Sequence, residues 1–223
     1  TNQLNRYEIG LFDIEDPNNK KDIDRLEELY LKYLFKKSNL TFGKQLLNTP
    51  FINLQDGRMR PTEAEGIWAD IRSIKKIKLQ GGYLYNISPR STVKWYRVDE
   101  SIGIYPSGVT VNGTKSTYAG NLHSKGILLA GITWQANSKL SISGWNQFTE
   151  NIFNSALLQA DYNHPLKNKS VLFASAQLIR QDALGNGGNN DPAKAYILPN
   201  AKAMTMGARI GWKNEQWETS LNY

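Results

Sequence analysis

The stretch from Met204 to Trp212, MTMGARIGW, shows the pattern that decides the fold of this chain. Its even-numbered positions are apolar, whereas its odd-numbered positions are small or polar. Successive side chains of a β-strand point to opposite faces of a sheet, so this period of two predicts a strand with one apolar and one polar face.

The same alternation recurs along the chain in segments of roughly ten residues. It is clear in the second half and less regular in the first half. The clear segments are 128–135, 140–143, 155–162, 172–178, 204–212 and 217–223, and the earlier ones are 6–12, 24–36, 39–48, 64–75 and 77–88. We therefore expect about eleven strands in an all-β, antiparallel protein.

Segment 24–36 is the most ambiguous of these candidates. Its apolar residues recur at spacings of three and four, which also fits an amphipathic helix. We favour a strand because Leu29, Leu31, Tyr33 and Phe35 alternate cleanly and lead into another alternating run.

The connections between these segments alternate in length, which places tight turns at one end of the sheet and large loops at the other. The short connections are 37–39, 75–76, 136–139 and 213–216, with 164–169 somewhat longer, and the long ones are 13–23, 49–65, 89–125 and 182–201. The connection 149–151 is short although it falls at the long-loop end. This asymmetry, with strands of about ten residues, is typical of a transmembrane β-barrel.

Aromatic residues give a second test of that architecture. Many lie on the apolar face within a few residues of a short turn: Tyr33, Phe35, Phe42, Trp134, Tyr162, Trp212 and Trp217. Amphipathic rings favour the headgroup level of a membrane, so the clustering predicts an interfacial girdle. Trp145 has the opposite phase and does not fit a girdle at the other end. A soluble β-sandwich or lipocalin-like barrel is the alternative, but such proteins have shorter strands and no systematic difference in loop length.

Composition excludes several classes of protein. The 223 residues include no Cys, which excludes a disulfide-stapled module and a thiolate metal site. No apolar run is long enough for a transmembrane helix. The net charge of +7 permits anionic solutes, anionic lipid or nucleic acid as partners. Many lysines gather at the short turns, however, where we favour a solvated rim over a partner-binding patch, so the charge alone does not identify a partner.

Residues that could carry chemistry are few. The two histidines, His123 and His164, lie in a loop and at a turn, and no nucleophile, phosphate-binding or metalloprotease motif is present. The stretch 185–191 is Gly- and Asn-rich, but it is a single copy and reads as a flexible loop rather than a calcium repeat. We expect no enzyme, no cofactor and no metal site.

The segment 49–66, TPFINLQDGRMRPTEAEG, is the most distinctive part of the chain. It combines an Asp56-Gly57 turn with Arg58, Arg60 and Pro61 between two convincing strands. From Gly43-Lys44-Gln45 through Gly57-Arg58-Met59-Arg60-Pro61 to Gly66, the sequence resembles the outer-membrane porin D family of substrate-specific diffusion channels. The resemblance is strong over residues 38–90 and extends to Tyr223 as strand order and length.

This resemblance implies a Gram-negative outer-membrane barrel of about 16 to 18 strands, in which residues 49–65 fold inward and narrow the pore. The constriction would be formed by Arg58, Arg60 and Asp56, with Arg58 lining it directly. Arg60 stands where the family more often has an apolar residue, which predicts a more basic pocket. The family's ladder of wall arginines lies largely on later strands than this chain contains.

We therefore interpret residues 1–223 as one β-barrel domain that is incomplete at both ends. Apolar residues such as Leu128, Ile132, Leu158 and Met206 are expected to face lipid. The expected pore-lining residues are Asp70, Arg72, Gln159, Asp161, Gln177, Arg209 and Glu218. The expected function is passive, selective diffusion of small solutes that carry a carboxylate, with small solutes and membrane lipid as partners and no nucleic acid.

Two alternatives from other classes stay open. The first is an outer-membrane adhesin or structural protein whose long loops bind an external partner. The second is a barrel enzyme, which would need a nucleophile and a base on one rim. The sequence does not identify the solute, nor does it distinguish a monomer from a trimer.

Overall fold

The computed structural model describes residues 16, 18–21, 24–54, 60–90, 92–104, 108–110, 113–166 and 169–223. In these residues nearly all regular structure is β-strand, arranged in one antiparallel sheet. The elements are β1 (Leu29–Phe35), β2 (Ser38–Gln45), β3 (Glu63–Ile71), β4 (Ile77–Ser88), β5 (Tyr96–Arg97), α1 (Val98–Ser101), β6 (Ile127–Gln135), β7 (Leu140–Thr149), β8 (Phe153–Pro165), β9 (Val171–Ala183), β10 (Lys202–Lys213) and β11 (Glu218–Asn222). No helix in the described part of the chain is long and apolar enough to cross a membrane.

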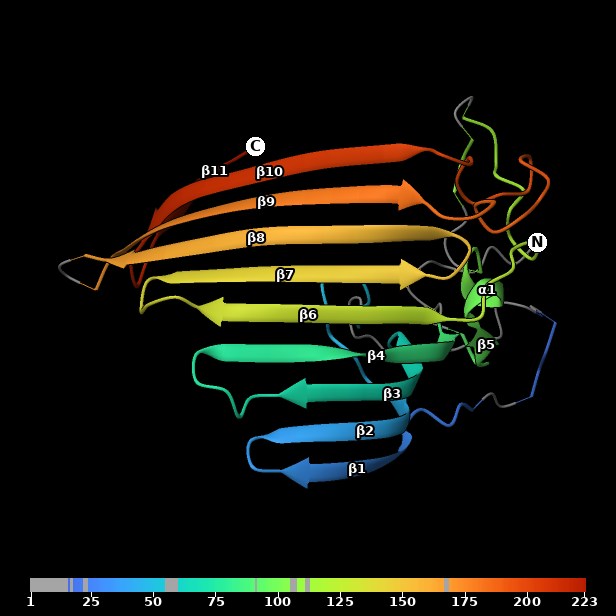
Figure 1. Ribbon diagram of the computed structural model, residues 1–223, viewed down its shortest axis with the longest axis horizontal. Coiled ribbons are helices and arrows are strands. Elements are labelled where there is room, and N and C mark those ends of the chain that lie inside the picture. Colours follow the sequence, from blue (N-terminus) through green and yellow to red (C-terminus); the bar gives the residue numbers. More distant parts are fainter. Residues whose placement is uncertain are drawn as a thin grey trace.

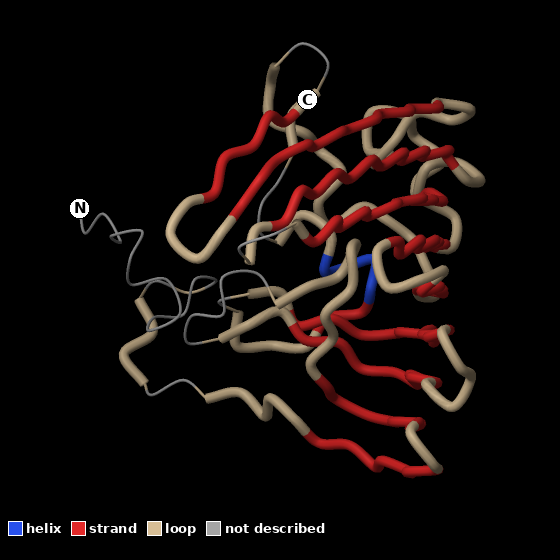
Figure 2. Tube along the Cα trace, turned by 90° about the vertical axis from the view of Figure 1, so that its left-hand side faces the viewer, coloured by secondary structure: helices blue, strands red, loops and turns tan. Residues whose placement is uncertain are grey.

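Each strand pairs with the next strand in the chain, except that β6 pairs with β4, because the two-residue β5 pairs only with the end of β4. The order along the sheet is therefore β1-β2-β3-β4-β6-β7-β8-β9-β10-β11, and all pairs are antiparallel. The sheet is curved, and the edge strands β1 and β11 are not paired with one another (Figure 2). The expected all-β antiparallel fold is confirmed.

The two ends of the sheet differ as expected. In Figure 1 the turns β1–β2, β3–β4, β6–β7, β8–β9 and β10–β11 lie at the left, and the long connections lie at the right. The long-loop end includes one short connection, the turn between β7 and β8 around Asn151, whose φ of 62° suits asparagine.

The strand predicted over 24–36 is confirmed for its second half, where β1 spans Leu29–Phe35. Residues 24–28 lie outside the sheet, because Arg25 turns toward the loops instead of toward β2. The strand predicted over 6–12 falls outside the described residues. The alternation did not reveal β5, since a two-residue strand is too short to show a period.

The register creates continuous rows of side chains across the sheet. One row joins Ile71, Leu79, Ile132, Gly144, Leu158, Leu178 and Met206 through successive partner positions. Its large side chains from Ile132 to Met206 are exposed, so this row defines an apolar convex face. Tyr33, Trp134, Tyr162 and Trp217 are also exposed near the short turns, where the girdle was expected.

The opposite, concave face has two zones. Near the short turns it is polar, as in the row Gln135, Ser141, Asp161, Ser175, Arg209 and Asn222. Toward the long loops it is apolar, and its buried cluster includes Trp68, Leu129, Trp145 and Leu157. The second zone needs a cover, and a loop provides it.

Candidate functional site

Residues 46–54 lie against the apolar zone of the concave face. Phe51 and Ile52 pack on the buried cluster that includes Trp68 and Leu129, and the segment passes behind the sheet in Figure 1. A turn around Thr49 shapes the loop, because the Thr49 amide donates to the Ile52 carbonyl at 2.8 Å and the Ile52 amide donates to Thr49 Oγ1 at 2.9 Å. The loop thus fills space that would lie inside a closed barrel.

Arg25 anchors the limb by which this loop returns to β3. Its guanidinium donates to the Pro61 carbonyl at 3.1 Å, to Ser88 Oγ at 2.9 Å and to the Thr92 carbonyl at 3.3 Å. Glu63 Oε2 lies 3.7 Å from Arg25 Nη2, and both side chains are only 1% exposed. One cation therefore joins the segment before β1, the start of β3 and the end of β4.

The residues expected at the constriction are only partly described. Arg60 begins the return limb and is partly buried. Asp56 and Arg58 fall outside the described residues, so their role stays a prediction.

Asp70 and Arg72, expected to line the pore, lie together at the short-turn end of β3. Arg72 donates from Nε and Nη2 to the two carboxylate oxygens of Asp70 at 2.7 and 2.9 Å, and Gln80 Nε2 donates to Oδ2 at 3.2 Å. The hydrogen bonds and charge of Asp70 raise the pKa of Arg72 above its usual value. The Arg72 amide donates to Ser38 Oγ at 3.0 Å, which fixes the end of the strand against β2.

A polar cavity of about 390 Å³ lies beside this pair, between the concave face and residues 46–48. It is lined by Lys32, Asn39, Thr41, Gln45, Leu46, Leu47, Asn48, Trp68, Asp70, Arg72, Lys78 and Gln80. Three of these residues, Lys32, Arg72 and Lys78, are cationic and one is acidic, so the lining carries an excess of positive charge. Lys32 and Lys78 were not among the residues expected here, although their phase in the alternation could have revealed them.

The other expected pore-lining residues gather on the concave side of β8 to β11. Gln159 Nε2 donates to Asp161 Oδ2 at 2.9 Å, and Ser175 Oγ donates to Asp161 Oδ1 at 2.8 Å. Arg209 pairs with Glu218 at 2.5 Å, and its guanidinium lies 4.7 Å from the centre of the Phe173 ring. Gln159, Gln177 and Arg209 line one cavity of about 290 Å³.

Trp145 lies on the concave face, in agreement with its opposite phase in the alternation. The residue is 9% exposed and belongs to the buried cluster under the loop. It lies opposite Gly131, and a Cβ at that glycine would meet the indole at 2.5 Å. The small partner at position 131 thus leaves room for the ring on this face.

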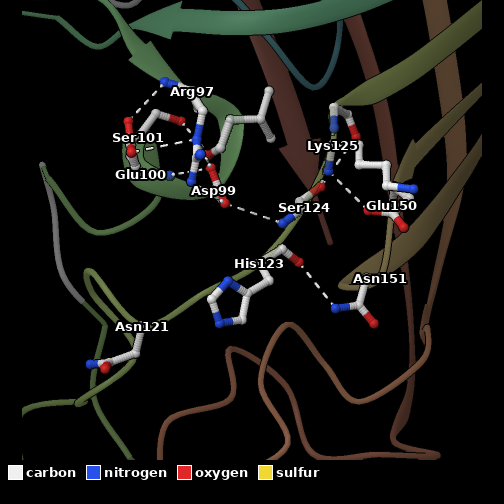
Figure 3. A network of polar contacts seen from close by, with 12 residues as sticks. Arg97, Asp99, Glu100, Ser101, Asn121, His123, Ser124, Lys125, Glu150 and Asn151 are labelled. Carbon is white, nitrogen blue, oxygen red and sulfur yellow. Dashed lines mark hydrogen bonds and ion pairs between the residues drawn. The ribbon is translucent and has the colours of Figure 1, made fainter.

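A polar network joins the long connection 98–126 to the turn after β7 (Figure 3). Arg97 donates twice to Asp99, at 3.2 and 3.0 Å, and the Ser124 amide donates to Asp99 at 3.4 Å. The contacts with the turn after β7 are two hydrogen bonds. The Lys125 amide donates to Glu150 at 2.9 Å, and Asn151 Nδ2 donates to the His123 carbonyl at 3.0 Å. We expected His123 to be a solvated loop residue. Its side chain is exposed, and only its backbone takes part in this network. Within the described residues no three His, Cys, Asp or Glu side chains cluster as a metal site would require.

Comparison with known proteins agrees with this architecture. No curated protein sequence matches the chain significantly. Among solved structures it is similar to Pseudomonas aeruginosa OpdK with vanillate, with a TM-score of 0.68 and 18% identity over 86% of this chain and 45% of that chain. It is also similar to Pseudomonas aeruginosa OccK2 (OpdF) in complex with glucuronate, with a TM-score of 0.67 and 19% identity over 86% of this chain and 46% of that chain. The chain thus spans less than half the length of these structures, and the likeness shows the fold.

The family follows from a separate match. Residues 11–214 match the model of the outer membrane porin, OprD family. This match covers most of the chain and agrees with the antiparallel sheet, the unequal loops and the apolar convex face. The chain belongs to the OprD family of outer membrane porins, and its sheet is a part of such a barrel, integral to the outer membrane.

Proposed function

We propose that this chain forms part of the wall and the constriction of a channel for small solutes that carry a carboxylate. The observation that carries the proposal is the cavity beside Asp70, because three cations line it against one acid. Residues 46–54 cover the adjoining apolar zone, which narrows the space on the concave side. Vanillate and glucuronate, bound by the two similar proteins, both carry a carboxylate.

Physical chemistry favours an anion in this cavity. The one acid, Asp70, is already engaged by Arg72 and Gln80, which leaves the positive charge of Lys32 and Lys78 in excess over the acidic charge of the lining. A carboxylate gains charge-assisted hydrogen bonds there, and attraction between charges is stronger beside a low-dielectric wall than in bulk water. An uncharged analogue of the same shape lacks these gains.

Single-channel recording of the full-length protein tests the proposal. Vanillate and glucuronate should interrupt or reduce the ionic current at lower concentrations than their uncharged counterparts, vanillyl alcohol and glucose. Lys78→Gln should weaken carboxylate binding by about 1.5 to 3 kcal/mol, the range for a hydrogen bond to a charged group. Lys76→Gln removes a charge two residues away in the turn and is the matched control, expected to change binding little.

The constriction arginines need their own variants. Arg58→Ala should lower carboxylate affinity and raise small-ion conductance, and Arg60→Ala should act in the same direction but less. Equal blocking by charged and uncharged solutes in the unmodified protein would refute a carboxylate channel, and a protein without any conductance would favour an adhesive or structural role.

A further inference from the structure

The two longest connections pack on each other at the end of the sheet away from the short turns. Tyr118, Leu122 and Ile152 form a buried cluster of their own, with Ile102 and Phe153 packed against it. The His123 amide donates to the Gly188 carbonyl at 2.8 Å, and Thr117 Oγ1 donates to the Ala193 carbonyl. These loops are thus a small structured unit with its own core.

A further cavity, of about 400 Å³, lies within this unit and is partly open to the outside, and it differs in character from the two cavities on the concave face. None of its described lining residues is charged, and they include Thr110, Ser116, Thr117, Tyr118, Ala195 and Tyr196. The rings of Tyr118 and Tyr196 meet edge to face at 5.1 Å between centroids. Burial raises the pKa of the Tyr196 phenol, and the neighbouring Tyr118 adds to this effect. The Tyr196 side of the cavity therefore stays neutral at ordinary pH.

Among the described lining residues, one buried side-chain oxygen lacks a hydrogen-bond partner. Ser116 Oγ is buried and makes no hydrogen bond, whereas Thr110 bonds Thr114, Thr117 bonds Ala193, and the Tyr118 hydroxyl accepts from the Gly108 amide at 2.7 Å. A buried hydroxyl without a partner is costly, so a bound group that pairs with it gains affinity. Water in a mainly apolar space of this size finds few partners, and its displacement by an apolar group also favours binding.

We propose that this cavity binds a small, uncharged aromatic molecule with one hydroxyl, the ring packing against Tyr118 and Tyr196 and the hydroxyl pairing with Ser116. A volume of about 400 Å³ lies within the usual range for small-molecule sites. A carboxylate is disfavoured because none of the described lining residues is a cation that could neutralise it. The site does not depend on the channel function proposed above, because it lies in the loops and prefers a neutral ligand.

Fluorine NMR of 4-fluorophenol with the full-length protein in phospholipid nanodiscs tests this site, with empty nanodiscs as the blank. We expect saturable binding that Ala195→Trp abolishes by filling the cavity. Ala136→Trp places the same side chain in the short turn after β6 and should leave binding unchanged. Ser116→Ala should weaken 4-fluorophenol about fivefold, the factor that corresponds to one ordinary hydrogen bond of about 1 kcal/mol, and should not affect fluorobenzene, which has no hydroxyl.

Three results would overturn the proposal: no saturable binding, binding that survives Ala195→Trp, or tighter binding of 4-fluorobenzoate to this cavity than of 4-fluorophenol. Arg60→Ala separates the two sites, because it should alter carboxylate block of the channel and leave 4-fluorophenol binding unchanged. Loss of 4-fluorophenol binding in that variant would place the probe in the channel and count against a loop site.

Discussion

Met206 shows how a single side chain on the convex face is tied to the bilayer. It is 64% exposed, although it is apolar and lies within a long strand, and its neighbours in the row are Leu178 and Leu158. Such exposure is costly in water but favourable against lipid chains. The alternation of β10 therefore has a direct energetic meaning in a membrane.

Met206→Arg should consequently destabilise the protein by about 2 to 4 kcal/mol if the residue lies near the bilayer midplane. Gln177→Arg, on the concave side of β9, is the matched control and should cost much less, since that face meets water. The free energy of unfolding of the full-length protein in lipid vesicles measures both. Equal costs for the two variants would contradict the assignment of faces.

At the scale of elements, Arg25 decides how the segment before β1 meets β3 and β4. Its contacts with Pro61, Ser88 and Thr92 come from two separate parts of the chain, and Glu27 and Glu63 supply nearby opposite charges. A buried pair of this kind contributes little net energy when intact, but the loss of one partner strands the other charge. The cost of breaking it should therefore be large.

Arg25→Ala should destabilise the protein by about 3 to 5 kcal/mol, the range for loss of one partner of a buried ion pair. Arg25→Ala combined with Glu63→Gln should cost clearly less than the sum of the single variants, because neither charge is then left alone. Equilibrium unfolding of the single and double variants measures the coupling. Strict additivity would show that the two side chains do not stabilise each other.

At the scale of the whole molecule, the curved sheet assigns every strand one lipid face and one water face. Cysteines at positions 158 and 159 probe this directly, since Leu158 lies in the exposed apolar row and Gln159 lines the cavity beside Arg209. In the full-length protein in vesicles, a membrane-impermeant thiol reagent should label the cysteine at 159 and spare the one at 158. Labelling of 158 alone would mean that the register is shifted by one residue, which reverses every side chain.

Much of this fold could be predicted from the sequence, because alternation is a local property of each strand. The strands β6 to β10, the short turns and the side of Leu158 and Met206 all follow from it, since a period of two survives in any sheet that separates two media. The segment before β1 could not be placed in this way. Arg25 leaves the sheet pattern to reach partners more than thirty residues away, and no local pattern encodes such a contact.

For the candidate site, too, some features could be predicted from the sequence and others could not. Asp70, Arg72, Gln159, Asp161, Gln177, Arg209 and Glu218 were predicted from the sequence to line the pore. The sequence does not show that Arg72 holds Asp70 with two hydrogen bonds, or that Lys32 and Lys78 join the same cavity. These groups come from different strands, and only the register between strands brings them together.

By itself, the sequence determined a sheet with an apolar and a polar face, tight turns at one end and long loops at the other, because those features depend on residues close together in the chain. Only the tertiary structure decided that residues 46–54 cover the buried tryptophans of the concave face, and that the outer loops share a core around Tyr118. Both arrangements depend on apolar surfaces that meet across long separations in sequence, where hydrophobic burial is favourable but carries no directional signal in the local pattern.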